Sequence, residues 1–225
     1  MKFIQRALDW LFPNYTCLVC KCELNNSDNI YACDKCVTQL AINVDEVKLV
    51  NESETQYFQK GFAPFVYDGD VTKLILSLKY NNNGLVAEFL APFMAATILR
   101  YKIDLTDFEI VPVPLCKKRR KFRGYNQSEL LADEVAKHLG LKVDTNILTR
   151  IKDTTPQKKM TVVERRENLD GAFATNNTNN IVGRSFIIVD DVFTSGSTTN
   201  ECAKMLIGAG ASCVYVLVAA KVEEH

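Results

Sequence analysis

Residues 189–198, with the sequence VDDVFTSGST, decide the fold of this chain. The preceding run from Phe186 to Val189 is continuous, apolar and rich in β-branched residues, which is typical of a strand buried on both faces of a parallel sheet. Asp190 and Asp191 end this run, and a Thr/Ser/Gly turn leads into a helix expected over 196–208. Because ligands of open parallel sheets bind at the carboxyl ends of the strands, the stretch predicts a binding site.

The same stretch indicates a site for a sugar phosphate. Free N–H groups at a helix start, together with small residues and hydroxyls, form an anion cradle. Two carboxylates beside such a cradle would repel a bare phosphate, but they suit sugar hydroxyls or a magnesium ion. The structural alternative is a helix N-cap cluster whose acidic residues favour the helix dipole. The stretch is not a Walker loop, because no lysine follows the glycine.

These ten residues closely resemble the phosphoribosyl pyrophosphate (PRPP) signature of the type I phosphoribosyltransferases. The resemblance implies that Asp190 and Asp191 hold the ribose hydroxyls of PRPP, which arrives with magnesium. It also implies that the following turn binds the 5′-phosphate, through Thr194, Ser195, Gly196, Ser197 and Thr198.

Helical and strand-like segments alternate outward from this stretch. The expected fold class is α/β: a parallel sheet flanked by helices, preceded by a small four-cysteine zinc ribbon. In the helix that begins at Asn126 and stops at Gly140, Glu129 stands at the capping-box position. Strands are expected over 62–67, 109–113, 142–146, 186–189 and 214–218, helices over 70–78, 85–99, 126–140 and 196–208, and a long loop over 149–170.

A second motif, Val-Pro-Val-Pro at 111–114, precedes six cationic residues among the seven at 117–123, which we expect to form a basic loop. A departing pyrophosphate needs such positive charge, whereas a solvated basic loop is the structural alternative. In phosphoribosyltransferases the loop after this strand binds pyrophosphate. The resemblance therefore assigns that role to Pro114, Leu115, Cys116 and Lys117, with Arg123 nearby.

The proline-rich strand end, together with Arg-Gly-Tyr-Asn-Gln at 123–127, resembles the ComF family of competence-associated proteins more narrowly. Residues 150–173 resemble the mobile loop that closes over PRPP and excludes water. The resemblance implies a cytoplasmic factor for natural transformation that handles incoming single-stranded DNA with a ComFA-like helicase partner. Two alternatives stay open: a phosphoribosyltransferase acting on a base or small metabolite, and a regulator that senses PRPP without turnover.

The N-terminal region contains two Cys-x-x-Cys pairs, Cys17/Cys20 and Cys33/Cys36. Four thiolates at this spacing match a structural tetrahedral zinc site, although Cys22 competes with Cys20 for the assignment. Redox thiols or free cysteines are the alternative. ComF-like proteins similarly open with an apolar helix ending in Phe-Pro, which residues 1–13 match, followed by a zinc ribbon.

Length and composition suit one globular domain with a small appendage. The expected division is 1–42 for the helix and ribbon, a polar and acidic linker over 43–60, and the phosphoribosyltransferase-like domain over 61–225. The chain has 27 basic residues (lysine and arginine) and 27 acidic residues (aspartate and glutamate), so these charges balance. A polyanion partner would therefore need a local basic surface. No apolar run approaches the roughly 20 residues of a membrane span, and a cytoplasmic location is expected.

Overall fold

The computed structural model describes residues 15–24, 30–40, 42–49, 55–81, 83–152, 171–176 and 180–223. The N-terminal helix expected over 1–13 and most of the expected mobile loop, residues 153–170, lie outside this part of the chain. Among the described residues, no helix is both long enough and apolar enough to cross a membrane.

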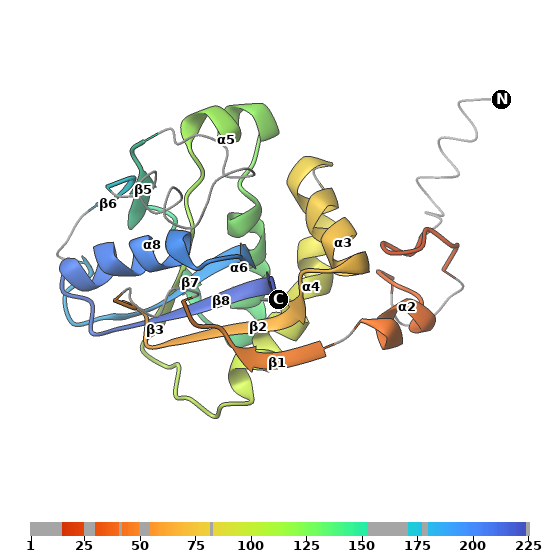
Figure 1. Ribbon diagram of the computed structural model, residues 1–225, viewed down its shortest axis with the longest axis horizontal. Coiled ribbons are helices and arrows are strands. Elements are labelled where there is room, and N and C mark those ends of the chain that lie inside the picture. The colour runs from red at the N-terminus through yellow and green to blue at the C-terminus, as the bar shows by residue number, and fades with distance from the viewer. Residues whose placement is uncertain are drawn as a thin grey trace.

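Helices and strands alternate along most of the described chain (Figure 1). The helices are α2 (Asp34–Gln39), α3 (Gly69–Tyr80), α4 (Gly84–Leu99), α5 (Lys117–Arg123), α6 (Gln127–Leu139) and α8 (Ser197–Gly208). The strands are β1 (Ile42–Glu46), β2 (Lys60–Val66), β3 (Phe108–Pro112), β4 (Lys142–Val143), β5 (Leu148–Arg150), β6 (Phe173–Thr175), β7 (Ser185–Phe193) and β8 (Cys213–Lys221).

Six strands form one sheet in the order β1-β2-β8-β7-β3-β4. The edge strand β1 is antiparallel to β2, and the remaining pairs are parallel. β5 and β6 form a separate antiparallel pair. The predicted fold class, a parallel sheet flanked by helices, is confirmed.

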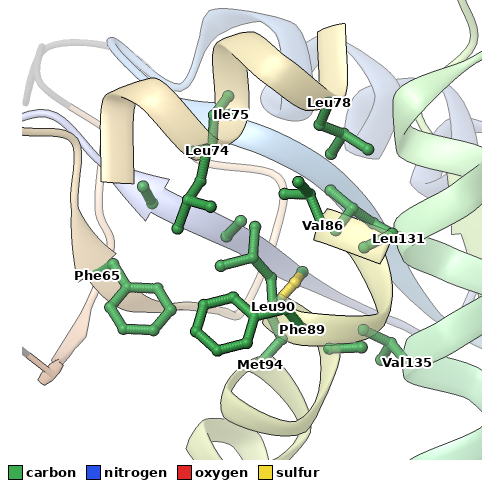
Figure 2. Close-up of a cluster of buried hydrophobic side chains, with 14 of the residues drawn as sticks. Phe65, Leu74, Ile75, Leu78, Val86, Phe89, Leu90, Met94, Leu131 and Val135 are labelled. Carbon is green, nitrogen blue, oxygen red and sulfur yellow. The ribbon is translucent and has the colours of Figure 1, made fainter. Parts of the chain in front are cut away.

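Alternate residues of β7 enter different cores because successive side chains of a strand point to opposite faces. Ile187 and Val189 belong to a core formed with α3, α4 and α6, part of which is shown in Figure 2. Phe186 and Ile188 belong to a second core that includes the buried face of α8. Burial on both faces explains why this strand is a continuous apolar run.

The cysteine-rich segment lies on the side of the sheet domain that carries α3 and α4 (Figure 1). Cys17 and Cys36 belong to the same buried cluster as residues of α3 and α4. The Tyr31 hydroxyl donates a hydrogen bond of 2.8 Å to Glu88 of α4, and the Tyr31 ring lies 6.2 Å from that of Phe89. The ribbon and the sheet domain therefore share part of one core.

Residues 43–60, expected to be an irregular linker, contribute to the sheet. Most of β1 falls in this segment, and β1 pairs with β2. The Gln59 amide donates to the carbonyl of Val214 at 2.9 Å, and the Val214 amide donates to the Gln59 side chain at 2.7 Å. The expectation was wrong for β1 because charged residues such as Glu46 are common on edge strands. The proposed division of the chain into domains stays a prediction.

Four other expectations need correction. The basic segment 117–123 is the helix α5 rather than a loop, since arginine and lysine are good helix formers even without an apolar period. The strand expected over 142–146 is only the two-residue β4, and residues 149–150 of the expected loop belong to β5. β7 continues to Phe193, so the acidic pair lies within the strand.

Candidate functional site

The acidic pair of β7 is buried, and helix α6 holds one member of it. Oδ1 of Asp190 accepts hydrogen bonds from the Ser128 hydroxyl at 2.7 Å and from the Asp191 amide at 2.9 Å. Ser128 is placed by Asn126, whose Oδ1 accepts from the Ser128 amide at 3.1 Å. The Asn126 side-chain amide also donates to the carbonyl of Val113 at 3.0 Å. The start of α6 is therefore fixed to the end of β3 and to Asp190.

The environment of Asp190 favours its neutral form. Burial and the negative charge of Asp191 raise the pKa of Asp190 to about 7 from an ordinary value of 3.8. Hydrogen bonds from Ser128 and the Asp191 amide, and the charge of Lys79, oppose this shift without cancelling it. Asp190 therefore changes its protonation near neutral pH.

Asp191 forms an ion pair with Lys79 at the end of α3. Lys79 Nζ lies 2.8 Å from Asp191 Oδ1, and the two side chains are only 19% and 6% exposed. Burial lowers the pKa of Lys79, but the charge and hydrogen bond of Asp191 outweigh burial and raise this pKa overall. Asp191 Oδ2 is buried and has no hydrogen-bond partner among the described residues. This oxygen is an unused acceptor.

The turn after β7 supplies backbone and hydroxyl groups. Gly196 has φ of +79° and caps α8, and a Cβ on this residue would lie 2.4 Å from the Phe193 ring and 2.7 Å from a methyl group of Leu49. The Ser195 and Ser197 hydroxyls lie 2.8 Å apart. Only glycine fits this position, because other residues disfavour positive φ and would clash here.

A pocket of about 190 Å³ joins the acidic pair to this turn and to a cationic wall. It lies at the carboxyl ends of the neighbouring strands β3 and β7. Its lining consists of Lys79, Val113, Pro114, Leu115, Arg119, Arg123, Gln127, Ser128, Arg150, Asp190, Asp191, Val192, Thr194 and Thr198.

The cationic wall comes from α5 and β5. Arg119 and Arg123 are half-buried at i,i+4 spacing, so they share one face of α5. Arg123 donates to Gln127 Oε1 at 2.8 Å and stacks 4.9 Å from the ring centre of Tyr80. Arg150 lies 5.2 Å over the Phe173 ring, and burial, followed by the charge of Arg119, lowers its pKa.

The expected pyrophosphate residues divide into two groups. Pro114, Leu115 and Arg123 line the pocket, whereas the lining does not include Cys116 or Lys117. Cys116 is buried before the start of α5, and Lys117 is exposed. Of the expected phosphate residues, Thr194 and Thr198 line the pocket.

The predicted capping box of α6 forms only in part, because the Glu129 side chain pairs with Arg120. Asn126 caps the helix, but the Glu129 carboxylate accepts two hydrogen bonds from Arg120, of 2.6 and 3.0 Å. The guanidinium group offers a bidentate, charge-assisted partner, which a single backbone amide cannot match.

Sequence reasoning missed Lys79 and Ser128 as functional candidates. Both reach the acidic pair from helices, α3 and α6, whose packing brings distant segments together. No local motif marks Lys79. Ser128 directly follows the Arg-Gly-Tyr-Asn-Gln motif, so its position next to that motif was an available signal.

The four predicted zinc ligands gather in one place. Single sulfur atoms of Cys17, Cys20, Cys33 and Cys36 lie within 4.8 Å of one another, a geometry in which thiolates bind a tetrahedral metal ion. Cys22 is exposed and is not part of this group. The grouping therefore favours Cys20 over Cys22.

The chain matches the phosphoribosyl transferase domain family over residues 126–224. It is 34% identical to the DNA utilization protein YhgH of Salmonella typhimurium over 154 residues, which cover 67% of this chain and 66% of that protein. Competence protein F of Haemophilus influenzae is 39% identical over 108 residues, 48% of this chain and 47% of the relative. Competence protein ComFC of Bacillus subtilis is 29% identical over 147 residues, 58% of this chain and 57% of the relative.

The parallel sheet and the domain match together define a protein with a phosphoribosyltransferase-type domain. More narrowly, the chain belongs to the ComF/ComFC family of competence-associated proteins. The matched region spans just under two thirds of the Salmonella relative's length and less of the other two.

Proposed function

We propose that this chain binds PRPP in the pocket at the carboxyl ends of β3 and β7 and serves DNA uptake in natural transformation. The observation that supports PRPP most strongly is the combination of charges in one pocket. Four cationic side chains surround two acidic ones, and hydroxyls of the turn complete the lining: Lys79, Arg119, Arg123, Arg150, Asp190, Asp191, Thr194 and Thr198. A ligand with both hydroxyls and several phosphates satisfies this arrangement, whereas a single phosphate does not.

The ligand's parts have distinct places in this proposal. The 5′-phosphate lies against the turn at 194–198, where α8 begins. The acidic pair, Asp190 and Asp191, which lines the pocket, accepts the ribose hydroxyls. The pyrophosphate lies beside Arg119 and Arg123, and magnesium arrives with it. If the site turns over, these arginines stabilise the charge of the departing pyrophosphate.

Thermal unfolding tests PRPP binding. A ligand that binds only the folded state stabilises it by about 2.7 kcal/mol at a hundredfold excess over its Kd. Magnesium-PRPP should therefore raise the Tm of the wild type, ribose 5-phosphate should raise it less, and inorganic phosphate least. Asp190→Asn combined with Asp191→Asn should abolish most of the PRPP shift while the ribbon keeps its metal. A folded double variant that PRPP protects as well as wild type would refute the assignment.

The competence role rests on the family and on a second surface of α5. Lys117, Lys118 and Lys121, here called the outer basic face, are exposed, and Phe122 beside them is 83% exposed. Cationic side chains with an exposed aromatic ring bind single-stranded DNA through its phosphates and by stacking on its bases. We therefore propose that incoming single-stranded DNA contacts this face in the cytoplasm. The helicase partner implied by the family stays a prediction.

The two faces of α5 allow the DNA proposal to be tested separately from PRPP. Replacing the three lysines of the outer basic face with glutamine should weaken single-stranded DNA binding and lower its salt dependence. The slope of the logarithm of the binding constant against the logarithm of salt concentration should become smaller by up to roughly 2, at about 0.7 per lost phosphate contact. PRPP binding should persist, because these lysines do not line the pocket. An unchanged salt slope would place the DNA site elsewhere, with the zinc ribbon as the next candidate.

We propose a structural zinc ion at Cys17, Cys20, Cys33 and Cys36. Their sulfur atoms lie within 4.8 Å of one another, and thiolate is the form of cysteine that binds metal. The four ligands are all supplied by the protein, which is typical of a structural site.

A further inference from the structure

The acidic pair already has a cation supplied by the chain. Lys79 Nζ is 2.8 Å from Asp191 Oδ1, and both side chains are largely buried. A buried ion pair costs desolvation free energy, and apolar replacements are often more stable. Its presence at a ligand pocket is therefore the feature that needs a functional explanation.

Contacts on both sides fix the end of α3 that carries Lys79. The Tyr125 hydroxyl donates a hydrogen bond to the carbonyl of Leu78, and the Arg123 guanidinium stacks on Tyr80. Three consecutive residues of α3 thus contact the last residue of α5, the segment that follows α5, or the acidic pair itself. Lys79 is held at Asp191 by its helix.

Two of the four carboxylate oxygens of the pair are already engaged by groups of the chain itself. Asp190 Oδ1 already accepts from Ser128 and from a backbone amide, and Asp191 Oδ1 is paired with the ammonium group. Magnesium requires octahedral oxygen ligands at short distances, and a fixed ammonium group next to it would repel it. Asp191 Oδ2 is buried and has no hydrogen-bond partner among the described residues.

We propose that Lys79 is the resident counter-ion of the acidic pair, so that the pair accepts ribose hydroxyls without a divalent ion of its own. Magnesium then reaches the pocket only as part of the PRPP complex. Lys79 acts as a positioning residue, because it keeps Asp191 oriented for the sugar. The sugar-binding part of this inference rests on the proposed function, whereas the absence of a metal site at the pair does not.

Manganese binding tests the counter-ion claim without any sugar ligand. Electron paramagnetic resonance should show the same amount of bound Mn²⁺ for the wild type and for Asp190→Asn combined with Asp191→Asn. An Mn²⁺ ion that the wild type binds and the double variant loses would overturn the proposal. This result does not depend on whether the chain binds PRPP.

Ribose 5-phosphate tests the positioning role, because it has no pyrophosphate to carry magnesium. Its binding to the wild type should be the same in EDTA and in magnesium. Lys79→Met should weaken it roughly tenfold, the loss expected for a hydrogen bond to a charged group. Lys79→Arg should restore most of the affinity, and Lys73→Met, on the exposed side of α3, is the matched control.

Lys79→Met leaves a buried carboxylate without its partner and can destabilise the fold. Lys79→Met combined with Asp191→Asn removes both charges, and this variant should unfold cooperatively but fail to bind ribose 5-phosphate. Loss of wild-type binding in EDTA, or wild-type affinity in a folded Lys79→Met protein, would refute the positioning role. If the wild type binds neither ribose 5-phosphate nor PRPP, the proposed function and the positioning role both fail, and the manganese result still decides the counter-ion claim.

Discussion

At alkaline pH, the Asp190→Asn variant should be more stable than the wild type. Burial and Asp191 raise the pKa of Asp190 from 3.8 to about 7, so the folded state holds a proton that the unfolded state releases. Between these values the folded state binds more protons, and wild-type stability falls as pH rises through about 4 to 7. Once Asp190 is ionised, this difference of about 3 between its pKa values in the folded and unfolded states lowers the free energy of unfolding by about 4 kcal/mol.

Asparagine has nearly the same shape, and its side-chain oxygen can accept from Ser128, but it does not ionise. Between pH 5 and pH 8, the free energy of unfolding of the wild type should fall by about 3 kcal/mol relative to that of Asp190→Asn. Urea unfolding of both proteins at these two pH values measures it, and Asp107→Asn, which removes an exposed carboxylate, is the control. A stability difference between Asp190→Asn and wild type that does not change with pH would refute the argument that burial dominates at Asp190.

Three further outcomes are expected. Gly196→Ala should destabilise the fold by at least about 1 kcal/mol, from positive φ alone, with added cost from the clash with Phe193, and chemical unfolding checks this. Elemental analysis should find one zinc ion per chain. The combined Cys33→Ser and Cys36→Ser variant should lose this zinc, and the Cys22→Ser variant should keep it. Zinc retained by the double variant would exclude the proposed ligands. Neutralising the outer basic face of α5 should lower the salt dependence of DNA binding, as measured by fluorescence anisotropy, and should leave the PRPP-induced Tm shift unchanged.

The local parts of the site could be predicted from the sequence. The acidic pair and the turn with Gly196 are contiguous, so one strand and one helix start determine their geometry. The ribbon was predictable for the same reason, because the spacing of its two cysteine pairs largely determines the metal-binding geometry.

The remaining parts depend on tertiary packing. Lys79 reaches Asp191 only because α3 and α6 pack over the same face of the sheet, which no local pattern records. The basic segment was predicted to be one loop. As a helix it separates Arg119 and Arg123, which line the pocket, from the lysines of the outer basic face.

A crystal structure of the chain with magnesium-PRPP tests the central claim most directly. The account predicts electron density for the 5′-phosphate against the 194–198 turn, for the ribose hydroxyls at the acidic pair, and for the pyrophosphate beside Arg119 and Arg123. It also predicts that magnesium contacts the pyrophosphate and that no metal ion bridges the two aspartates. Bound PRPP located outside this pocket, or a pocket that stays without ligand density at saturating PRPP, would contradict the account.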